Sequence, residues 1–107
     1  MQYLVLGAEI LTGHPLKDEF GDPHTKLDYH ALPLSNNLKQ RIHDWDIASS
    51  AVLNALMRGL CKKEFEESFR TMDAEGIALA RCIAHELGDA VKIKYYSEDK
   101  AIWISVE

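Results

Sequence analysis

The chain has 107 residues, of which 47% are apolar and 27% charged, so it can bury one hydrophobic core and residues 1–107 are expected to form a single domain. No stretch reaches the roughly 18 consecutive apolar residues of a spanning helix, and the amino terminus lacks the pattern of a signal peptide, so we expect a cytoplasmic protein without membrane contact. The formal net charge of −5 argues against binding nucleic acid through phosphate contacts.

The first predicted element is a strand over Tyr3–Ile10, a short apolar run that suits a buried strand better than a helix of so few residues. Glycine and proline then interrupt some twenty residues from Thr12 to Pro33, which excludes a continuous helix there. Connections this long within a small domain are usually functional or disordered. The loop 12–33 is therefore a candidate functional segment.

A first helix is predicted to begin within Leu34–Asn37, because a serine or asparagine side-chain oxygen there can accept a hydrogen bond from a free backbone N–H of the first turn. Gly59 marks the end of this helix near Leu60. Ser49 and Ser50 are weak helix formers in its middle, which leaves room for a break there. Its apolar stripe consists of Leu38, Ile42, Trp45, Val52 and Leu56.

A second apolar series keeps helical phase from Phe65 to Leu87, and Gly88 is a suitable terminator because glycine readily adopts the left-handed conformation that closes a helix. Gly76 occupies a position on the apolar stripe, where glycine is less favourable than alanine by about 1 kcal/mol. Thr71 or Asp73 could cap a new helix, so we expect a break near residues 70–73.

The last segment alternates apolar and polar residues in two runs, Val91–Tyr96 and Ile102–Val106, which predicts a hairpin with one apolar face. The fold class is therefore α+β, with two or three helices packed on a small, mainly antiparallel sheet that ends in a C-terminal β-hairpin. The place of the first strand in that sheet cannot be read from spacing. On the opposite face of the hairpin, Tyr96 and Trp103 either present aromatic area to a partner or pair across the strands.

The histidines of loop 12–33 are the candidate metal ligands. His14, His24 and His30 lie there with two aspartates, but their spacing differs from the helical pairs and short spacings that direct two ligands at one ion. We therefore expect no metal and no cofactor. A small hydrolase or metal-dependent enzyme that uses this loop is the alternative, and it would show perturbed histidine titration and a stoichiometric metal.

One further pair could serve nucleophilic catalysis, Cys82 and His85, one helical turn apart. Helix periodicity alone produces such pairs, and the sequence has neither nucleophile-elbow glycines nor a phosphate-binding loop. We therefore expect no enzymatic activity. A third reading is an oligomer-forming module that pairs edge strands, which would form a homodimer insensitive to salt.

Acidic residues are concentrated in three segments. Together, Glu9–His30, Lys62–Gly76 and Glu98–Glu107 carry a net charge of −7, whereas the remainder carries +2. These segments fall in predicted connections and element ends, where carboxylates either meet a partner or stay solvated. A basic protein partner fits this distribution.

From Leu32 to Ser97 the sequence resembles small bacterial immunity proteins of contact-dependent growth inhibition and other polymorphic toxin systems, whereas nothing similar covers the first thirty residues. The residues that carry the resemblance are L-P-L-S from Leu32 with Leu38, Ile42 and Trp45, D-A-E-G-I-A-L-A from Asp73, E-L-G from Glu86, and V-K-I-K-Y-Y-S from Val91.

This resemblance implies a protein without activity of its own that binds one cognate toxin domain and blocks its active site or an essential surface. A nuclease is the expected toxin class, because nuclease substrate channels are usually basic, and an acidic inhibitor mimics phosphate charge and gains association rate by steering. Reversing loop acids to lysine is expected to weaken that binding. Eight residues are expected to bind the partner: Asp18, Glu19, Asp22, Glu64, Glu66, Glu67, Glu98 and Asp99.

Overall fold

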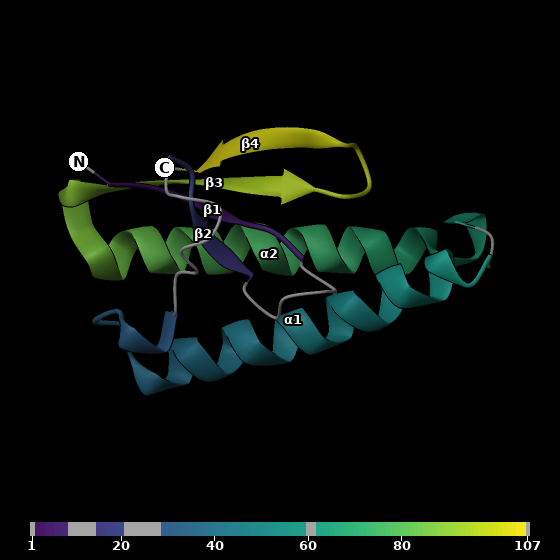
Figure 1. The fold of residues 1–107 in the computed structure, drawn as a ribbon, viewed down its shortest axis with the longest axis horizontal. Helices are drawn as coiled ribbons and strands as arrows, with labels where there is room; N and C mark the ends of the chain where they lie inside the picture. Colours follow the sequence, from purple (N-terminus) through teal and green to yellow (C-terminus); the bar gives the residue numbers. More distant parts are fainter. Residues whose placement is uncertain (1, 9–14, 21–28, 60–61, 107) are drawn as a thin grey trace.

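The computed structural model describes residues 2–8, 15–20, 29–59 and 62–106. It has two helices packed on a four-stranded mixed sheet (Figure 1), which confirms the predicted α+β class and the C-terminal hairpin. The helices are α1 (Asn36–Met57) and α2 (Glu66–Leu87), and the strands are β1 (Gln2–Leu6), β2 (Leu16–Asp18), β3 (Val91–Ser97) and β4 (Ile102–Val106). Short 3-10 turns lie at Tyr29–Ala31, Lys62–Phe65 and Gly88–Ala90.

The strand order is β2-β1-β3-β4. The first strand therefore lies inside the sheet, where it pairs parallel to β3 with Leu4 opposite Ile93. The other two pairings, β1 with β2 and β3 with β4, are antiparallel. A parallel pair needs a long crossover, and α1 and α2 lie within the chain that joins β1 to β3.

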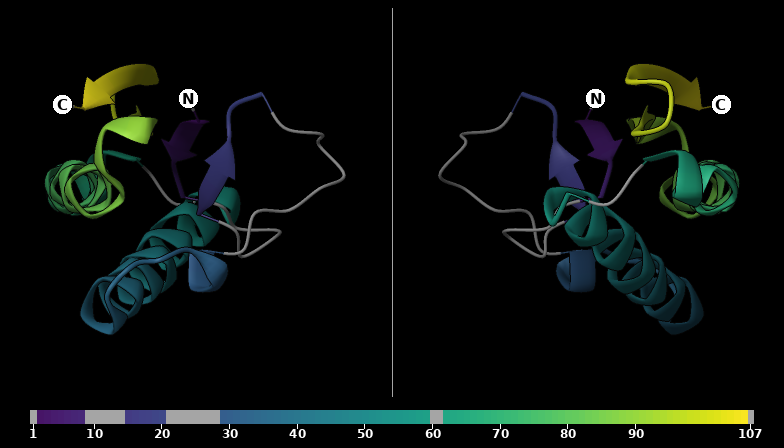
Figure 2. Two further views of the ribbon diagram at one scale, coloured as in Figure 1. Left: turned by 90° about the vertical axis from the view of Figure 1, so that its left-hand side faces the viewer. Right: turned by 90° about the vertical axis from the view of Figure 1, so that its right-hand side faces the viewer.

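Both helices lie on the same side of the sheet (Figure 2). Leu4, Leu6 and Tyr95 are fully buried, and Ile93 nearly so, because alternate strand residues point toward the helices. The residues between them point to the opposite face, which we call the helix-free face. The core thus lies between the sheet and the two helices.

Helix α1 begins as the sequence predicts. The Ser35 hydroxyl accepts a hydrogen bond from the Leu38 N–H at 3.2 Å. Glu86, near the end of α2, accepts from the Ser35 N–H at 2.6 Å and from its hydroxyl at 2.9 Å. A carboxylate near a helix N-terminus also interacts favourably with the helix dipole. Helix α1 runs unbroken through Ser49 and ends at Met57.

The predicted break near residues 70–73 is wrong, because α2 is continuous from Glu66 to Leu87. Asp73 caps nothing: its carboxylate is buried and accepts hydrogen bonds from the hydroxyls of Tyr95 at 2.8 Å and Ser97 at 2.6 Å. Gly76 faces the Tyr95 ring so closely that a Cβ there would lie 2.6 Å from Cζ. The glycine is thus required by packing against β3 and does not mark a helix end.

Trp45 belongs to the core, with 5% of its surface exposed. Its indole N–H donates to the Met72 carbonyl at 2.9 Å, and the Tyr95 hydroxyl lies 3.4 Å from the same oxygen. The ring of Trp45 meets that of Tyr95 edge-on, with centroids 6.0 Å apart. One carbonyl of α2 therefore connects α1 with β3.

Three predicted elements differ in detail from the structure. Strand β1 ends at Leu6, short of the predicted Ile10, and residues 9–14 lie outside the described part of the chain. The loop 12–33 contains a short edge strand, β2, in addition to a 3-10 turn. The apolar face of β4 is incomplete, because Ile102 is 48% exposed whereas Val106 is buried. Within the described residues, no helix is long and apolar enough to cross a membrane.

Candidate functional site

The predicted partner-binding acids divide between two hollows of the surface. Asp18, Glu19 and Glu98 line one of about 400 Å³, and Glu64 and Glu67 line another of about 720 Å³. Asp18 and Glu19 thus share one hollow with Glu98, which is distant in the sequence, whereas Glu64 and Glu67 lie in a separate hollow. Of the other three, Glu66 and Asp99 line neither hollow, and Asp22 lies outside the described residues.

The smaller hollow, called the sheet-face hollow, lies on the helix-free face. Its aromatic wall consists of Tyr96 and Trp103, whose side chains pair across β3 and β4 with ring centroids 4.7 Å apart. Trp103 is 58% exposed, so the two readings of these aromatics both hold: they pair across the strands and present aromatic area. The full lining is Val5, Gly7, Ala8, Lys17, Asp18, Glu19, Tyr96, Glu98 and Trp103.

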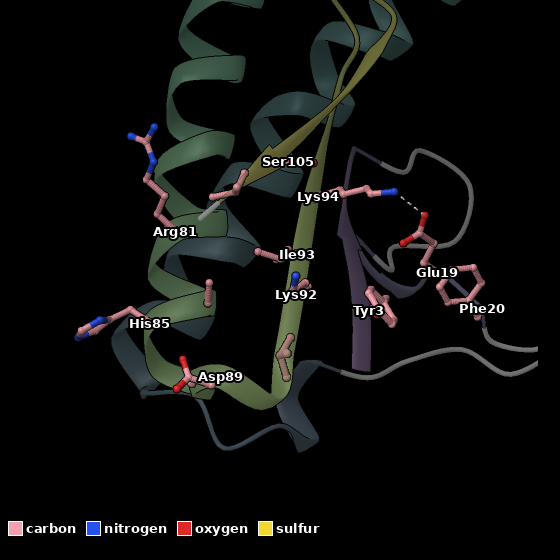
Figure 3. Close-up of a pocket in the computed structure, with 14 residues that line it drawn as sticks. Tyr3, Glu19, Phe20, Arg81, His85, Asp89, Lys92, Ile93, Lys94 and Ser105 are labelled. Carbon is pink, nitrogen blue, oxygen red and sulfur yellow. Dashed lines mark hydrogen bonds and ion pairs between the residues drawn. The ribbon is translucent and has the colours of Figure 1, made fainter. Parts of the chain in front are cut away.

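Lysines accompany the acids of this face. Lys94 pairs with Glu19 at 2.9 Å (Figure 3), and Lys17 lies in the same hollow as Asp18. Phe20, 75% exposed, meets Tyr3 edge-on at 5.4 Å. The helix-free face therefore mixes both charges with aromatic rings.

A third hollow, of about 800 Å³, extends from Tyr3 and Phe20 past β3 to the end of α2. In Figure 3, His85 and Arg81 project from α2 on one side of β3, and Glu19 lies on the other. Its lining contains three cationic side chains, Arg81, Lys92 and Lys94, and two carboxylates, Glu19 and Asp89. It therefore lacks the surplus of negative charge that would attract a basic partner.

The hollow that contains Glu64 and Glu67 is a groove between the middle of α1 and the first half of α2, and we call it the interhelical groove. Its floor is largely apolar, and its rim carries four carboxylates but a single cationic side chain, Arg41. The full lining is Arg41, Asp44, Trp45, Ala48, Ser49, Val52, Glu64, Glu67, Ser68, Thr71, Met72 and Glu75.

Arg41 is already engaged inside the groove. It forms an ion pair with Glu75 at 3.1 Å and lies 3.7 Å from the Cys82 sulfur. The hydrogen bond with Glu75 is the main reason that the pKa of Arg41 is raised above its ordinary value. Of the other rim acids, Glu64 and Glu67 have no hydrogen-bonding or ionic partner among the residues that the structure describes. The groove thus keeps an excess of negative charge.

Most of this chain is matched by the sequence model of a known family. The sequence model of a family described as Serratia CdiI immunity protein-like matches residues 4–98. The chain belongs to this family. The match confirms the predicted relationship to immunity proteins of contact-dependent growth inhibition, and it also covers most of the first thirty residues, where the sequence suggested no resemblance. A comparison with curated proteins gave no match.

Family membership gives this immunity protein a general role in neutralising a toxin and points to a non-enzymatic function. The structure also locates the two groups of residues that the sequence suggested as candidates for catalysis or metal binding. Cys82 is half-buried and its recorded partner is Arg41, whereas His85 is exposed. Of the three histidines considered as candidate metal ligands, His14 and His24 lie outside the described residues. Within the described residues, no group of three candidate ligands surrounds a common point.

Three residues of the interhelical groove were missed by sequence reasoning: Asp44, Ser49 and Glu75. Ser49 left a signal, because it falls on the apolar stripe of α1 between Trp45 and Val52. A polar residue on an otherwise apolar stripe indicates either a buried hydrogen bond or a site. Glu75 lies in the acidic segment Lys62–Gly76, but only the packing of α1 on α2 places it with Asp44 at one groove.

Proposed function

We propose that this immunity protein neutralises its toxin by covering a basic surface of the toxin domain with the acidic rim of the interhelical groove, and that the toxin is a nuclease. A nuclease must present cationic side chains to bind phosphates. An inhibitor that places carboxylates there competes with the substrate, and opposite charge accelerates the encounter. The observation that carries the proposal is the surplus of carboxylates around the groove, with Arg41 as its one cationic lining residue.

The charge balance favours the groove over the sheet-face hollow. On the helix-free face, Glu19 is paired with Lys94, and Lys17 is a further cationic side chain that lines the sheet-face hollow. In the groove, Glu64 and Glu67 remain available to a partner. We therefore assign attraction of the toxin mainly to the interhelical groove. We assign Asp18, Glu19 and Glu98 a smaller contribution through the sheet-face hollow.

The test begins with the toxin domain that co-purifies with the tagged protein from its native host. Its cleavage of RNA and DNA is measured with and without the immunity protein, and the dissociation constant of the complex is measured at two salt concentrations. The double variant Glu64→Lys, Glu67→Lys should bind at least about 100-fold more weakly, since reversing charges at the centre of an interface costs several kcal/mol. Higher salt should weaken wild-type binding more than variant binding.

The matched control is Glu66→Lys. Glu66 and Glu67 both lie in the first turn of α2 and are exposed, but only Glu67 lines the groove. Each reversal removes a similar favourable interaction with the helix dipole, about 0.3–1 kcal/mol, so a difference in toxin binding reports the groove. Equal loss of binding in the single variants Glu66→Lys and Glu67→Lys would refute the groove as the contact. A toxin that binds but cleaves no nucleic acid would refute the nuclease assignment.

A further inference from the structure

The Ser49 hydroxyl is buried and lacks a hydrogen-bond partner among the residues that the structure describes. Its surface is 2% exposed, and its Oγ makes no hydrogen bond within the described part of the chain. Leaving a buried polar group unsatisfied costs about 1–3 kcal/mol, and most such groups in native proteins have a partner. Ser49 lines the interhelical groove, so a molecule that enters the groove can supply the missing hydrogen bond.

The walls of the groove indicate what that molecule should be. Trp45, Val52 and Met72 offer apolar and aromatic surface, and Glu64 and Glu67 add carboxylates at the rim. A long aliphatic chain that ends in a cation satisfies both features, because lysine and arginine bury their methylenes against apolar surface while the charged end makes polar contacts. A guanidinium or ammonium group also has donors to spare for a hydroxyl acceptor.

We propose that the interhelical groove is a specificity pocket for a single lysine or arginine side chain of the toxin domain, with Ser49 Oγ as the hydrogen-bond acceptor on its floor. The methylenes of that side chain pack on Val52 and Met72, and its charge is met by Glu64 and Glu67. This inference rests on the proposed function and adds the chemistry of the contact. It assigns Ser49 a binding role that the fold itself does not require.

A direct test uses small probes instead of the toxin. Nα-acetyl-arginine amide and Nα-acetyl-citrulline amide have nearly the same shape, but only the first is charged. The probes are titrated while the indole N–H resonance of Trp45 is followed by NMR, in a Trp103→Phe background that leaves one tryptophan. The arginine probe should shift this resonance saturably, and Glu67→Gln should weaken its binding severalfold, whereas Glu66→Gln should not. Equal shifts from both probes, or no saturable shift from the arginine probe, would overturn the inference.

The second arm uses the co-purified toxin domain and the variant Ser49→Ala. Because the hydroxyl has no partner among the described residues of the free protein, its removal should leave the urea midpoint of unfolding unchanged or raise it. The same variant should bind the toxin about tenfold more weakly, since it removes an acceptor for a charged donor in the complex. A lower midpoint with unchanged toxin affinity would identify Ser49 as a structural residue and overturn the inference.

The two arms separate this inference from the proposed function. If the double reversal of Glu64 and Glu67 abolishes neutralisation while Ser49→Ala and the probes show no effect, the specificity pocket is refuted and the proposed function stands. If the purified protein binds no toxin but the arginine probe still binds beside Trp45, the proposed function fails and the pocket remains as a site for a cationic side chain.

Discussion

The contact between Gly76 and Tyr95 leads to a quantitative prediction about stability. An alanine Cβ at position 76 would lie 2.6 Å from Cζ and 2.9 Å from Oη of Tyr95, whereas carbon atoms in favourable contact are about 3.5–4.0 Å apart. Tyr95 is fully buried, so its ring has no free space into which to move. The substitution Gly76→Ala therefore forces a rearrangement of the core.

The expected size of the effect follows from three contributions. Replacing a helical glycine by alanine is favourable by about 1 kcal/mol. Overpacking a core typically costs about 1–3 kcal/mol, and displacing the ring breaks the hydrogen bond from Tyr95 to the buried Asp73 carboxylate, worth about 1.5–3 kcal/mol for a charged acceptor. The net expectation for Gly76→Ala is a loss of about 1.5–5 kcal/mol in the free energy of unfolding.

The assay is urea unfolding followed by circular dichroism, with Ala74→Gly as calibration. Ala74 is exposed in the same helix, so this variant measures the intrinsic difference between glycine and alanine, about 1 kcal/mol. In a Tyr95→Leu background, where the ring is absent, Gly76→Ala should lose most of its destabilising effect. A Gly76→Ala variant that is more stable than the wild type would refute the close packing of α2 against β3.

Two other predictions concern Tyr95 and Ser35. Burial, together with the neighbouring Asp73, raises the pKa of Tyr95 above its ordinary value of about 10. Its stabilising contribution is therefore complete below pH 10 and is lost as the pH rises further, because only the unfolded state then releases the proton readily. Urea unfolding between pH 8 and 11 should show a steeper loss of stability in the wild type than in Tyr95→Phe, and parallel curves would contradict this linkage. Ser35→Ala removes the cap of α1 and should lower the free energy of unfolding by about 1 kcal/mol, whereas Ser35→Thr should retain most of it; an unchanged urea midpoint in Ser35→Ala would show that the cap contributes nothing.

Local patterns in the sequence predicted the elements whose stabilising groups are near in the chain. The start of α1 depends on Ser35 and the N–H of Leu38, three residues away, and the hairpin depends on alternation within Val91–Val106. In both cases the residues whose interaction defines the element are close together in the sequence, so a local pattern is sufficient to predict the element. The start of α1 and the C-terminal hairpin were predicted correctly for this reason.

Prediction from the sequence was wrong where an element depends on a contact between residues that are far apart in the chain. A glycine at position 76 suggests a helix break when α2 is considered alone, yet the Tyr95 ring of β3 occupies the space beside it. The parallel pairing of β1 with β3 joins segments some ninety residues apart, and nothing in the composition of β1 selects that partner. Strand β2 has only three residues, too few for alternation to be recognised.

The candidate site follows the same division. Glu64 and Glu67 could be selected because acids accumulate in their segment, but charge density alone does not distinguish them from Glu66, which lines neither of the two acid-bearing hollows. Only the packing of α1 against α2 places Glu64 and Glu67 at the groove and leaves Glu66 outside it. Asp44 became a candidate for the same reason, since it lies outside the acid-rich segments of the sequence and acquires Glu64, Glu67 and Glu75 as neighbours across the groove.

The interhelical groove combines a floor that belongs to the core with a rim of exposed acids, and this combination affects how its specificity for a toxin could change. Its floor includes Trp45 and Met72, which are fixed by the hydrogen bond between them and by Tyr95 beneath. A floor held by the core is preorganised, so a side chain that enters loses little binding energy to reordering of the protein. The rim acids Glu64 and Glu67 are exposed, and exposed substitutions usually change stability by no more than about 0.5 kcal/mol. Under the proposed function, rim residues can therefore be exchanged to match a different toxin while the core that shapes the groove stays intact.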